Sequence, residues 1–203
     1  MIKTKEDLIE YMRCDQIALH CEEFNRPRFG RDEIWKFERL LRKAEYYTNN
    51  KKDIIHKLCY VFYKYRFHKM SVQLGFSIPV NVFDKGLSIA HYGPIVINHK
   101  AKIGKNCRIQ ESVTIGSTGG NDGAPEIGDH VFIASGARII GDVVLGNHIA
   151  VGANAVVTKS FKEDHITLAG VPARKISNHG SEGFVCRKLL SEKDQKDDWH
   201  SNN

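Results

Sequence analysis

His91 is the residue of this sequence whose surroundings best suit acid–base chemistry. The imidazole of histidine has an ordinary pKa of about 6.5, so it can accept a proton near neutral pH. His91 stands out among the ten histidines because it comes two residues after the aliphatic Ile89 and continues as Tyr92-Gly93-Pro94, in a stretch with two extra residues. A bulge of this kind redirects a side chain outward. We therefore predict that His91 is an exposed general base.

The stretch around His91 belongs to a repeat of period six that runs from Leu87 to Val157. A branched aliphatic residue recurs at each repeat, and a small or turn-tolerant residue follows most of these aliphatics. The repeated positions are Ile97, Ile103, Ile109, Ile115, Ile127, Ile133, Ile139, Leu145, Val151 and Val157, with Asn121 alone breaking the pattern. Six residues suit a short strand and a tight turn, and three such units close a triangular coil of about eighteen residues. A β-sandwich would instead alternate with period two, so the repeat predicts a mainly β fold, a parallel β-helix.

Three motifs in this region resemble those of the hexapeptide-repeat acyltransferases. They are Ser88-Ile-Ala-His-Tyr-Gly-Pro-Ile-Val-Ile97, Ser112-Val-Thr-Ile-Gly-Ser117 and Leu168-Ala-Gly-Val-Pro-Ala-Arg174. The segment of about residues 75–177 is similar to the serine acetyltransferase branch and its saccharide-modifying relatives. The resemblance implies a left-handed β-helix, the hand opposite to the general rule for parallel crossovers. It also implies a homotrimer with sites between neighbouring subunits, acetyl-CoA as co-substrate, and His91 as the base that activates an acceptor hydroxyl.

The coil length then predicts an acidic partner for His91. One coil of about eighteen residues plus the two extra residues leads from position 91 to Glu111, and another eighteen lead to Asp129. Successive rungs of a parallel sheet are about 4.8 Å apart. A carboxylate at that distance could orient the imidazole and stabilise its protonated form, as in a catalytic triad. Both acids are equally well explained as ordinary polar residues on an outer face.

The resemblance also indicates how acetyl-CoA would bind. Small corner residues, which would let the pantetheine amides approach the backbone, are Ser117, Ser135 and Ala153. Cations near the end of the β-helix, which would bind the phosphates, are Lys159, Arg174 and Lys175. Small residues at the corners are equally what tight turns require. The glycine-rich loop 118–124 lacks the strand-to-helix context of a phosphate-binding loop, and we expect it to cover the donor or shape the acceptor pocket. No ligand spacing predicts a metal.

The sequence departs from serine acetyltransferases where the acceptor would bind. In that branch one acid precedes the catalytic histidine, a second lies near the start of the β-helix, and an arginine–histidine pair precedes a proline. The residues of this chain at the matching places are Ser77, Ala90, Gly123 and Ala124. Because charge-assisted hydrogen bonds worth about 1.5–3 kcal/mol each are lost, we expect a saccharide hydroxyl of a surface-polysaccharide precursor as acceptor. Serine O-acetyltransferase, an amino-sugar N-acetyltransferase and a non-catalytic β-helix scaffold are the alternatives.

The rest of the chain divides into a helical N-terminal domain (1–72), the β-helix (73–177) and a polar C-terminal tail (178–203). The third predicted helix, about 54–67, carries an apolar stripe among basic residues: Ile54, Ile55, Leu58, Val61, Phe62 and Tyr65. We expect this stripe to pack on the β-helix or on another subunit, rather than to bind a membrane or nucleic acid.

Composition sets only broad limits. The 203 residues carry a formal charge of +6 at pH 7, which favours an anionic partner without identifying it. Five scattered cysteines form no zinc or disulfide pattern, and the N-terminus lacks the apolar run of a signal peptide. No apolar stretch approaches the roughly 18 residues of a membrane span. The cysteines, the N-terminus and the lack of an apolar span predict a cytoplasmic protein. The resemblance, and not the charge, implies acetyl-CoA as the anionic partner, with nucleic acid not among the expected partners.

Overall fold

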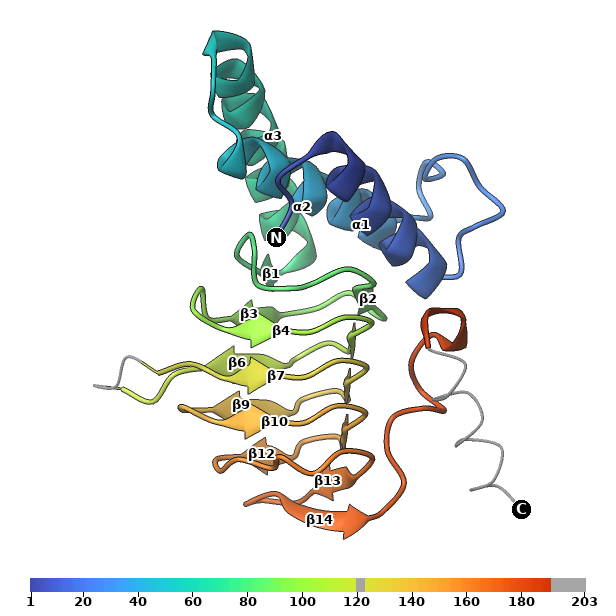
Figure 1. The fold of residues 1–203 in the computed structure, drawn as a ribbon, viewed down its shortest axis with the longest axis vertical. Coiled ribbons are helices and arrows are strands. Elements are labelled where there is room, and N and C mark those ends of the chain that lie inside the picture. Colours follow the sequence, from blue (N-terminus) through green and yellow to red (C-terminus); the bar gives the residue numbers. More distant parts are fainter. Residues whose placement is uncertain (120–122, 191–203) are drawn as a thin grey trace.

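A cap of three helices covers one end of a parallel β-helix (Figure 1). The computed structural model describes residues 1–119 and 123–190, so Asn121, which breaks the six-residue repeat, lies outside the described residues. The helices are α1 (Lys5–Ala18), α2 (Glu33–Asn49) and α3 (Ile54–Leu74). Thr4 and Asp7 form a capping box at the start of α1. Gly75 ends α3 in the left-handed region with a φ of 78°.

Short strands from successive coils stack into three sheets, one on each wall of the β-helix. The first sheet has the order β1 (Phe76–Ser77), β3 (Ile95–Ile97), β6 (Thr114–Gly116), β9 (Arg138–Ile140) and β12 (Val156–Val157). The second has the order β10 (Val144–Leu145), β7 (Glu126–Ile127) and β4 (Lys102–Ile103). The third has the order β14 (Arg174–Ser177), β13 (Thr167–Ala169), β11 (Ala150–Val151), β8 (Phe132–Ile133), β5 (Arg108–Ile109) and β2 (Ser88–Ile89). All pairs are parallel except β13 with β14.

The aliphatic residues of the six-residue repeat fill the interior, as predicted. Those that are at most 5 % exposed are Ile97, Ile103, Ile109, Ile115, Ile127, Ile133, Ile139, Leu145, Val151 and Val157. Residues at equivalent positions stack from coil to coil, for example Ile109 on Ile133 and Ile133 on Val151. Burial of each such side chain contributes about 1.5–3 kcal/mol relative to leaving it in water.

The coils are not equally long, and this corrects the predicted register. Ile89 pairs with Ile109 after 20 residues, which includes the two extra residues after His91. Ile109 pairs with Ile133 after 24 residues, and Ile133 with Val151 after 18. The additional six residues of the middle coil lie between Ile115 at the end of one wall and Ile127 on the next, so they form a loop rather than a fourth wall. The six-residue repeat continues in phase after this loop. The residue of the next coil that lies beneath a given position is, however, different from the one expected for a coil of eighteen residues.

A buried ion network joins the helical cap to the first coil. The guanidinium of Arg42 is fully buried and donates to the carboxylates of Asp15 at 2.7 Å and Glu45 at 3.0 Å. It also donates to the backbone carbonyls of Phe83 at 2.9 Å and Asp84 at 2.7 Å. Burial alone would lower the pKa of Arg42, but the charges of Asp15 and Glu45 outweigh it and raise that pKa above its ordinary value. The network therefore fixes the cap on the β-helix.

The cap also satisfies the open edge of β2, the strand that precedes His91. Asp15 accepts hydrogen bonds from the backbone N–H groups of Gly86 at 2.8 Å and Leu87 at 3.0 Å. Glu38 accepts one from the N–H of Ile89 at 3.1 Å. Burial, and secondarily the charge of Asp15, raises the pKa of the Glu38 carboxyl well above its ordinary value. Because an unpaired edge strand is free to fray or pair elsewhere, these contacts hold the chain on which His91 is carried.

The outer part of α3 differs from the prediction. Its inner side chains Phe67, Met70 and Leu74 pack on the core. The stripe was predicted to pack on the β-helix or on another subunit, and within this chain it is exposed, with exposed fractions from 52 % at Phe62 to 74 % at Ile54. The first alternative is therefore wrong, because α3 is apolar on both sides and its other side faces inward. The second alternative stays a prediction.

The chain after β14 runs back along the outside of the β-helix toward the cap (Figure 1). Phe184 stacks on Phe132 of β8 with ring centroids 4.6 Å apart, and Val185, Cys186 and Leu190 are buried. Up to residue 190, the polar tail predicted from the sequence therefore contributes side chains to the packed structure. No helix within residues 1–119 and 123–190 is long and apolar enough to cross a membrane.

Candidate active site

The structure brings four of the predicted site residues into one column on one corner of the β-helix. His91, Glu111, Ser135 and Ala153 each come two residues after a stacked aliphatic residue at the end of β2, β5, β8 and β11. Because those aliphatic residues are direct ladder partners, Glu111, Ser135 and Ala153 occupy equivalent places in successive coils, and the two extra residues of the first coil bring Gly93 against Glu111 with His91 beside it on the bulge. The column places the candidate base on the first rung and the candidate carboxylate on the second.

Glu111 is held by the third rung. Its carboxylate oxygen Oε1 accepts a hydrogen bond from Ser135 Oγ at 2.5 Å, and Ser135 N in turn donates to Gln110 Oε1 at 2.9 Å. The Ser135 hydrogen bond is the main reason that the pKa of Glu111 lies below its ordinary value, and the positive charge of nearby His91 lowers it further. Glu111 Oε2 is buried and has no hydrogen-bond partner in the described part of the chain. A fixed, ionised carboxylate therefore lies next to His91.

The backbone at this corner is shaped for the close approach of two coils. Gly93 has a φ of 132°, and a Cβ atom added there would lie 3.1 Å from Glu111 Cβ. Ser112 N donates to Pro94 O at 2.7 Å, which ties the bulge after His91 to the coil below. The His91 side chain itself is exposed. An exposed imidazole beside an ionised carboxylate can remove a proton from a substrate and be stabilised in its charged form.

The other predicted residues lie elsewhere. Two strands of the β1–β12 sheet, β6 and β12, end shortly before Ser117 and Lys159. These two residues therefore occupy the next corner and not the His91 column. Asn98 Nδ2 donates to Ser117 Oγ at 3.1 Å. Arg174 and Lys175 lie on β14, where Arg174 is exposed and the Lys175 ammonium pairs with Glu163 at 2.5 Å.

Asp129 does not extend the column, contrary to the coil arithmetic. Its Oδ1 accepts a hydrogen bond from Lys105 N at 2.8 Å, at the corner after β4 and β7. The prediction assumed eighteen residues per coil, whereas the coil below Glu111 has 24, so Ser135 occupies the place assigned to Asp129. The sequence does not show that Ser135 takes this place, because the loop 117–125 hides which strands of successive coils are paired.

The places that matched the acceptor contacts of serine acetyltransferases carry no charged side chain. Ala90 is half-buried beside His91, and Ala124 is 8 % exposed. A Cβ atom added to Gly123 would lie 2.5 Å from Asp142 Cβ, so the backbone here leaves no room for a side chain. The remainder of the loop at 120–122 lies outside the described residues.

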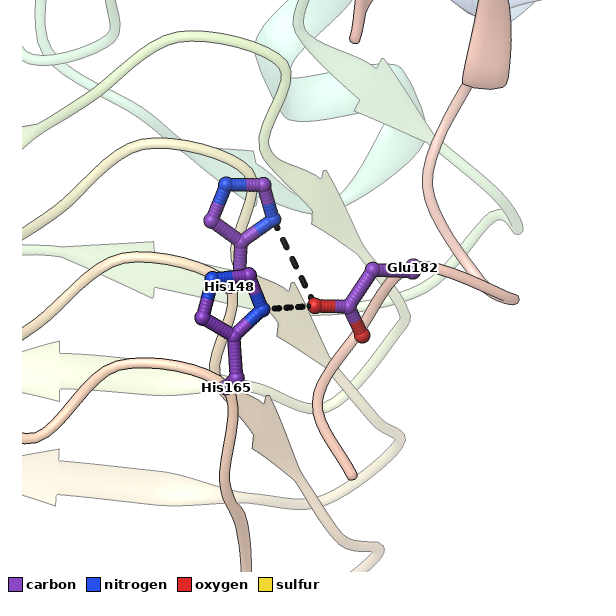
Figure 2. A group of neighbouring side chains, drawn as sticks. All are labelled: His148, His165 and Glu182. Carbon is purple, nitrogen blue, oxygen red and sulfur yellow. Dashed lines mark hydrogen bonds and ion pairs between the residues drawn. The ribbon is translucent and has the colours of Figure 1, made fainter. Parts of the chain in front are cut away.

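A second group of polar side chains, which was not predicted from the sequence, lies at the corner that precedes the strands β8, β11 and β13. His130, His148 and His165 stack one above another, with centroids 4.7 and 4.4 Å apart. Glu182 reaches this ladder from the C-terminal segment: its Oε1 pairs with His165 Nδ1 and lies 3.6 Å from His148 Nδ1 (Figure 2). The three histidines are 18 and 17 residues apart, one coil each, so the coil length could have revealed the ladder, whereas Glu182 comes from a distant segment that no spacing indicates.

The geometry of this group favours an ion-pair contact over a metal centre. The two imidazole nitrogens and the carboxylate oxygen lie within 4.8 Å of one another, a set that could include a cation. The rings of His148 and His165, however, are inclined by only 10° and their centroids are 4.4 Å apart. Nitrogen lone pairs lie in the ring planes, so two nearly parallel rings cannot both direct them at one ion about 2.1 Å away. We interpret Glu182 as the side chain that fixes residues 178–190 to the β-helix.

Comparison with known proteins agrees with the repeat. Residues 124–159 match the family model "Bacterial transferase hexapeptide (six repeats)". A serine acetyltransferase of Staphylococcus aureus strain Mu50 is 37 % identical over 98 residues, which are 47 % of this chain and 46 % of that protein. The serine acetyltransferase of Staphylococcus epidermidis strain ATCC 12228 has the same identity over the same shares. The predicted resemblance to the hexapeptide-repeat acyltransferases is confirmed. The match spans about half the length of these curated relatives.

Solved structures of the same family share the fold. Serine acetyltransferase from Brucella abortus strain S19 in complex with coenzyme A superposes with a TM-score of 0.66 at 25 % identity, covering 87 % of this chain and 70 % of that one. Serine acetyltransferase from Neisseria gonorrhoeae gives a TM-score of 0.66 at 22 % identity, covering 95 % and 72 %. The predicted left-handed β-helix with a helical cap is thus confirmed.

Proposed function

We propose that this protein transfers the acetyl group of acetyl-CoA to a hydroxyl, with His91 as general base. The observation that carries the proposal is the column of His91, Glu111 and Ser135, which couples an exposed imidazole to an ionised carboxylate. The relatives are serine acetyltransferases, and one of the similar structures is a complex with coenzyme A. The family provides the reaction type, and the column provides the residues of this chain that would perform it.

In the proposed reaction His91 removes the proton of the acceptor hydroxyl as its oxygen attacks the thioester carbonyl. The tetrahedral intermediate then collapses, the carbon–sulfur bond breaks, and the CoA thiolate takes the proton from His91. Glu111 orients the imidazole and stabilises its charged form during both steps. Removal of a general base costs about 10²- to 10⁴-fold in rate.

We further propose that the small residues of the corners bind the pantetheine arm. Ala153 lies two rungs below Glu111, so an arm running down the His91 column would pass Ser135 and Ala153 and reach β14 near Arg174. Ser117 and Lys159 lie on the next corner and would contribute from a neighbouring β-helix in the proposed trimer. Lys175 is the weakest candidate for a phosphate contact because its ammonium already pairs with Glu163.

The sequence and the comparisons indicate different acceptors. The comparisons favour serine over the saccharide expected from the sequence and give no support to a polysaccharide pathway. We therefore place serine first. A neutral sugar hydroxyl remains the second candidate because Ala90 and Gly123 leave the matching places without the charges that would bind a zwitterion.

The test measures release of the CoA thiol from acetyl-CoA, with serine and with a panel of saccharides in parallel, and with His91→Ala as the control. Serine-dependent release that His91→Ala abolishes would support the first candidate. Saccharide-dependent release would retain the mechanism and change the acceptor. Calorimetry with acetyl-CoA gives an independent measurement, because a folded protein that neither binds acetyl-CoA nor releases thiol would be a scaffold, contrary to the proposal.

A further inference from the structure

The α3 outer face is a continuous apolar stripe that the described structure leaves uncovered. We define it by the side chains Ile54, Ile55, Leu58, Val61, Phe62 and Tyr65, which are 52–74 % exposed. Their spacing of one, three or four residues places them on one side of the helix. Single exposed apolar residues are ordinary in soluble proteins, but a contiguous group of six large ones marks an interaction surface.

This face is distinct from the one that holds α3 on the protein. Tyr63 stacks on Tyr47 of α2 with centroids 5.1 Å apart, and Phe67 packs on Phe37 with centroids 5.4 Å apart. These contacts use the opposite side of the helix and account for its attachment to the cap. Figure 1 shows the first turns of α3 at the end of the molecule farthest from β14. His56 in the first turn contacts Tyr47 of α2, with ring centroids 5.9 Å apart, so the side of α3 turned away from α2 is the one left for a partner.

Within α3 the charges around the stripe are all of one sign, and the acidic N-cap residue Asp53 pairs with His56. Between Ile54 and Leu74, α3 contains no aspartate or glutamate, and its cations are Lys57, Lys64, Arg66 and Lys69. By helical position, Lys57 and Lys64 border the stripe on one side and Arg66 on the other. Lys51 and Lys52 precede the helix. An apolar stripe between two cationic borders is the pattern of a helix that lies in the surface of an anionic bilayer.

A two-fold contact between copies of the chain fits this pattern less well, and a contact between different surfaces of neighbouring copies, as in the proposed trimer, is tested below by light scattering. In a two-fold contact the same face meets itself, so the lysines and arginine of one α3 would oppose those of the other. With no acid on either helix, the borders of such a contact would repel each other. A membrane containing anionic phospholipid supplies both an apolar layer for the stripe and negative charge for its borders.

We propose that the α3 outer face binds the surface of membranes that contain anionic phospholipid. In this arrangement α3 lies along the lipid headgroups, with Leu58 and Phe62 entering the acyl boundary and the flanking cations facing the headgroups. The inference uses none of the residues assigned to acetyl transfer and stands independently of that function.

The test is co-sedimentation of the full chain with vesicles of phosphatidylcholine, with and without phosphatidylglycerol. We expect binding only to vesicles with phosphatidylglycerol, and weaker binding as salt is raised, because the surface attraction is screened. Leu58→Ser with Phe62→Ser should reduce the bound fraction by about tenfold, since burial of the stripe supplies the apolar part of the affinity. Lys57→Gln with Lys64→Gln should remove the dependence on phosphatidylglycerol.

Phe29→Ser is the matched control, because Phe29 is 99 % exposed and lies outside α3. All variants should keep the far-ultraviolet circular dichroism of the parent, since none of the replaced side chains is buried. The proposal fails if the parent does not bind anionic vesicles, or if the Leu58 and Phe62 variant binds as the parent does. Light scattering tests the other occupant: a lower number of subunits in that variant would assign the face to a second copy of the chain.

Discussion

Replacement of Glu111 by glutamine tests the catalytic column most directly. Glutamine keeps the shape of the side chain and an oxygen that can accept the hydrogen bond from Ser135 Oγ. It removes the negative charge that would stabilise protonated His91. The expected result is slower turnover with little change in the affinity for acetyl-CoA.

The size of the effect follows from the spacing of the column. Glu111 and His91 follow strands on successive rungs, and we take the strand spacing of about 4.8 Å as the order of the charge separation. A unit charge pair at that distance is worth about 1 kcal/mol in water and about 3.5 kcal/mol at an effective dielectric constant near 20. Because the His91 side chain is exposed, the lower part of this range applies, about 1–2 kcal/mol. That corresponds to a decrease in kcat of about 5- to 30-fold.

The assay is steady-state release of CoA thiol, measured across pH with whichever acceptor supports turnover. The hydrogen bond from Ser135 lowers the pKa of Glu111, so this carboxylate stays ionised below its ordinary range and does not set the acid limb of the rate profile. The lower kcat of Glu111→Gln should therefore persist on the acid side of the profile, because the charge that the variant lacks is still present there in the parent. Glu126→Gln, an exposed carboxylate on another wall, is the control. Unchanged kcat in Glu111→Gln beside a large loss in His91→Ala would remove Glu111 from the mechanism.

The remaining predictions concern stability, measured as the free energy of unfolding by chemical denaturation. Arg42→Met should cost about 3–5 kcal/mol, because it leaves the buried carboxylates of Asp15 and Glu45 without their cation. The deficit should shrink at acid pH, because burial raises the pKa of Glu45 and protonation removes its charge. The exposed pair of Arg28 provides the control, and Arg28→Met should change stability by less than about 1 kcal/mol. Ile133→Ala should cost about 2–5 kcal/mol by opening a cavity inside the β-helix. A loss of stability no larger than that of a substitution on the protein surface would contradict the buried, stacked position of Ile133.

Local pattern predicted much of the fold because the β-helix is built from nearest-neighbour contacts. Each coil contacts only the coils on either side, so a six-residue period determines which side chains point inward. Ile109, Ile133 and Val151 are buried and stacked as the period requires. His91 was found by the same logic, since two extra residues in a regular repeat indicate a bulge. The exposed position of His91 agrees with that prediction.

Features that depend on contacts between distant segments could not be predicted from the six-residue repeat or from helical periodicity. Glu182 meets His148 and His165 only because residues 178–190 return along the β-helix, and no local rule indicates that path. Both sides of α3 are apolar, so the pattern could not say which side packs on the β-helix within the chain. In each case the sequence contains the interacting groups, but the partner is set by tertiary packing.

The length of the middle coil decides the electrostatics of the column. Had that coil contained eighteen residues, Asp129 would lie below Glu111, and two carboxylates one rung apart would raise the pKa of one of them. The 24-residue coil instead places Ser135 there, and its hydroxyl donates to Glu111 and lowers that pKa. A carboxylate that stays ionised can stabilise protonated His91, whereas one that shares a proton with a neighbouring acid does so less. The loop 117–125 therefore contributes to the proposed chemistry by setting which residue lies beneath Glu111, whatever further role it has toward substrates.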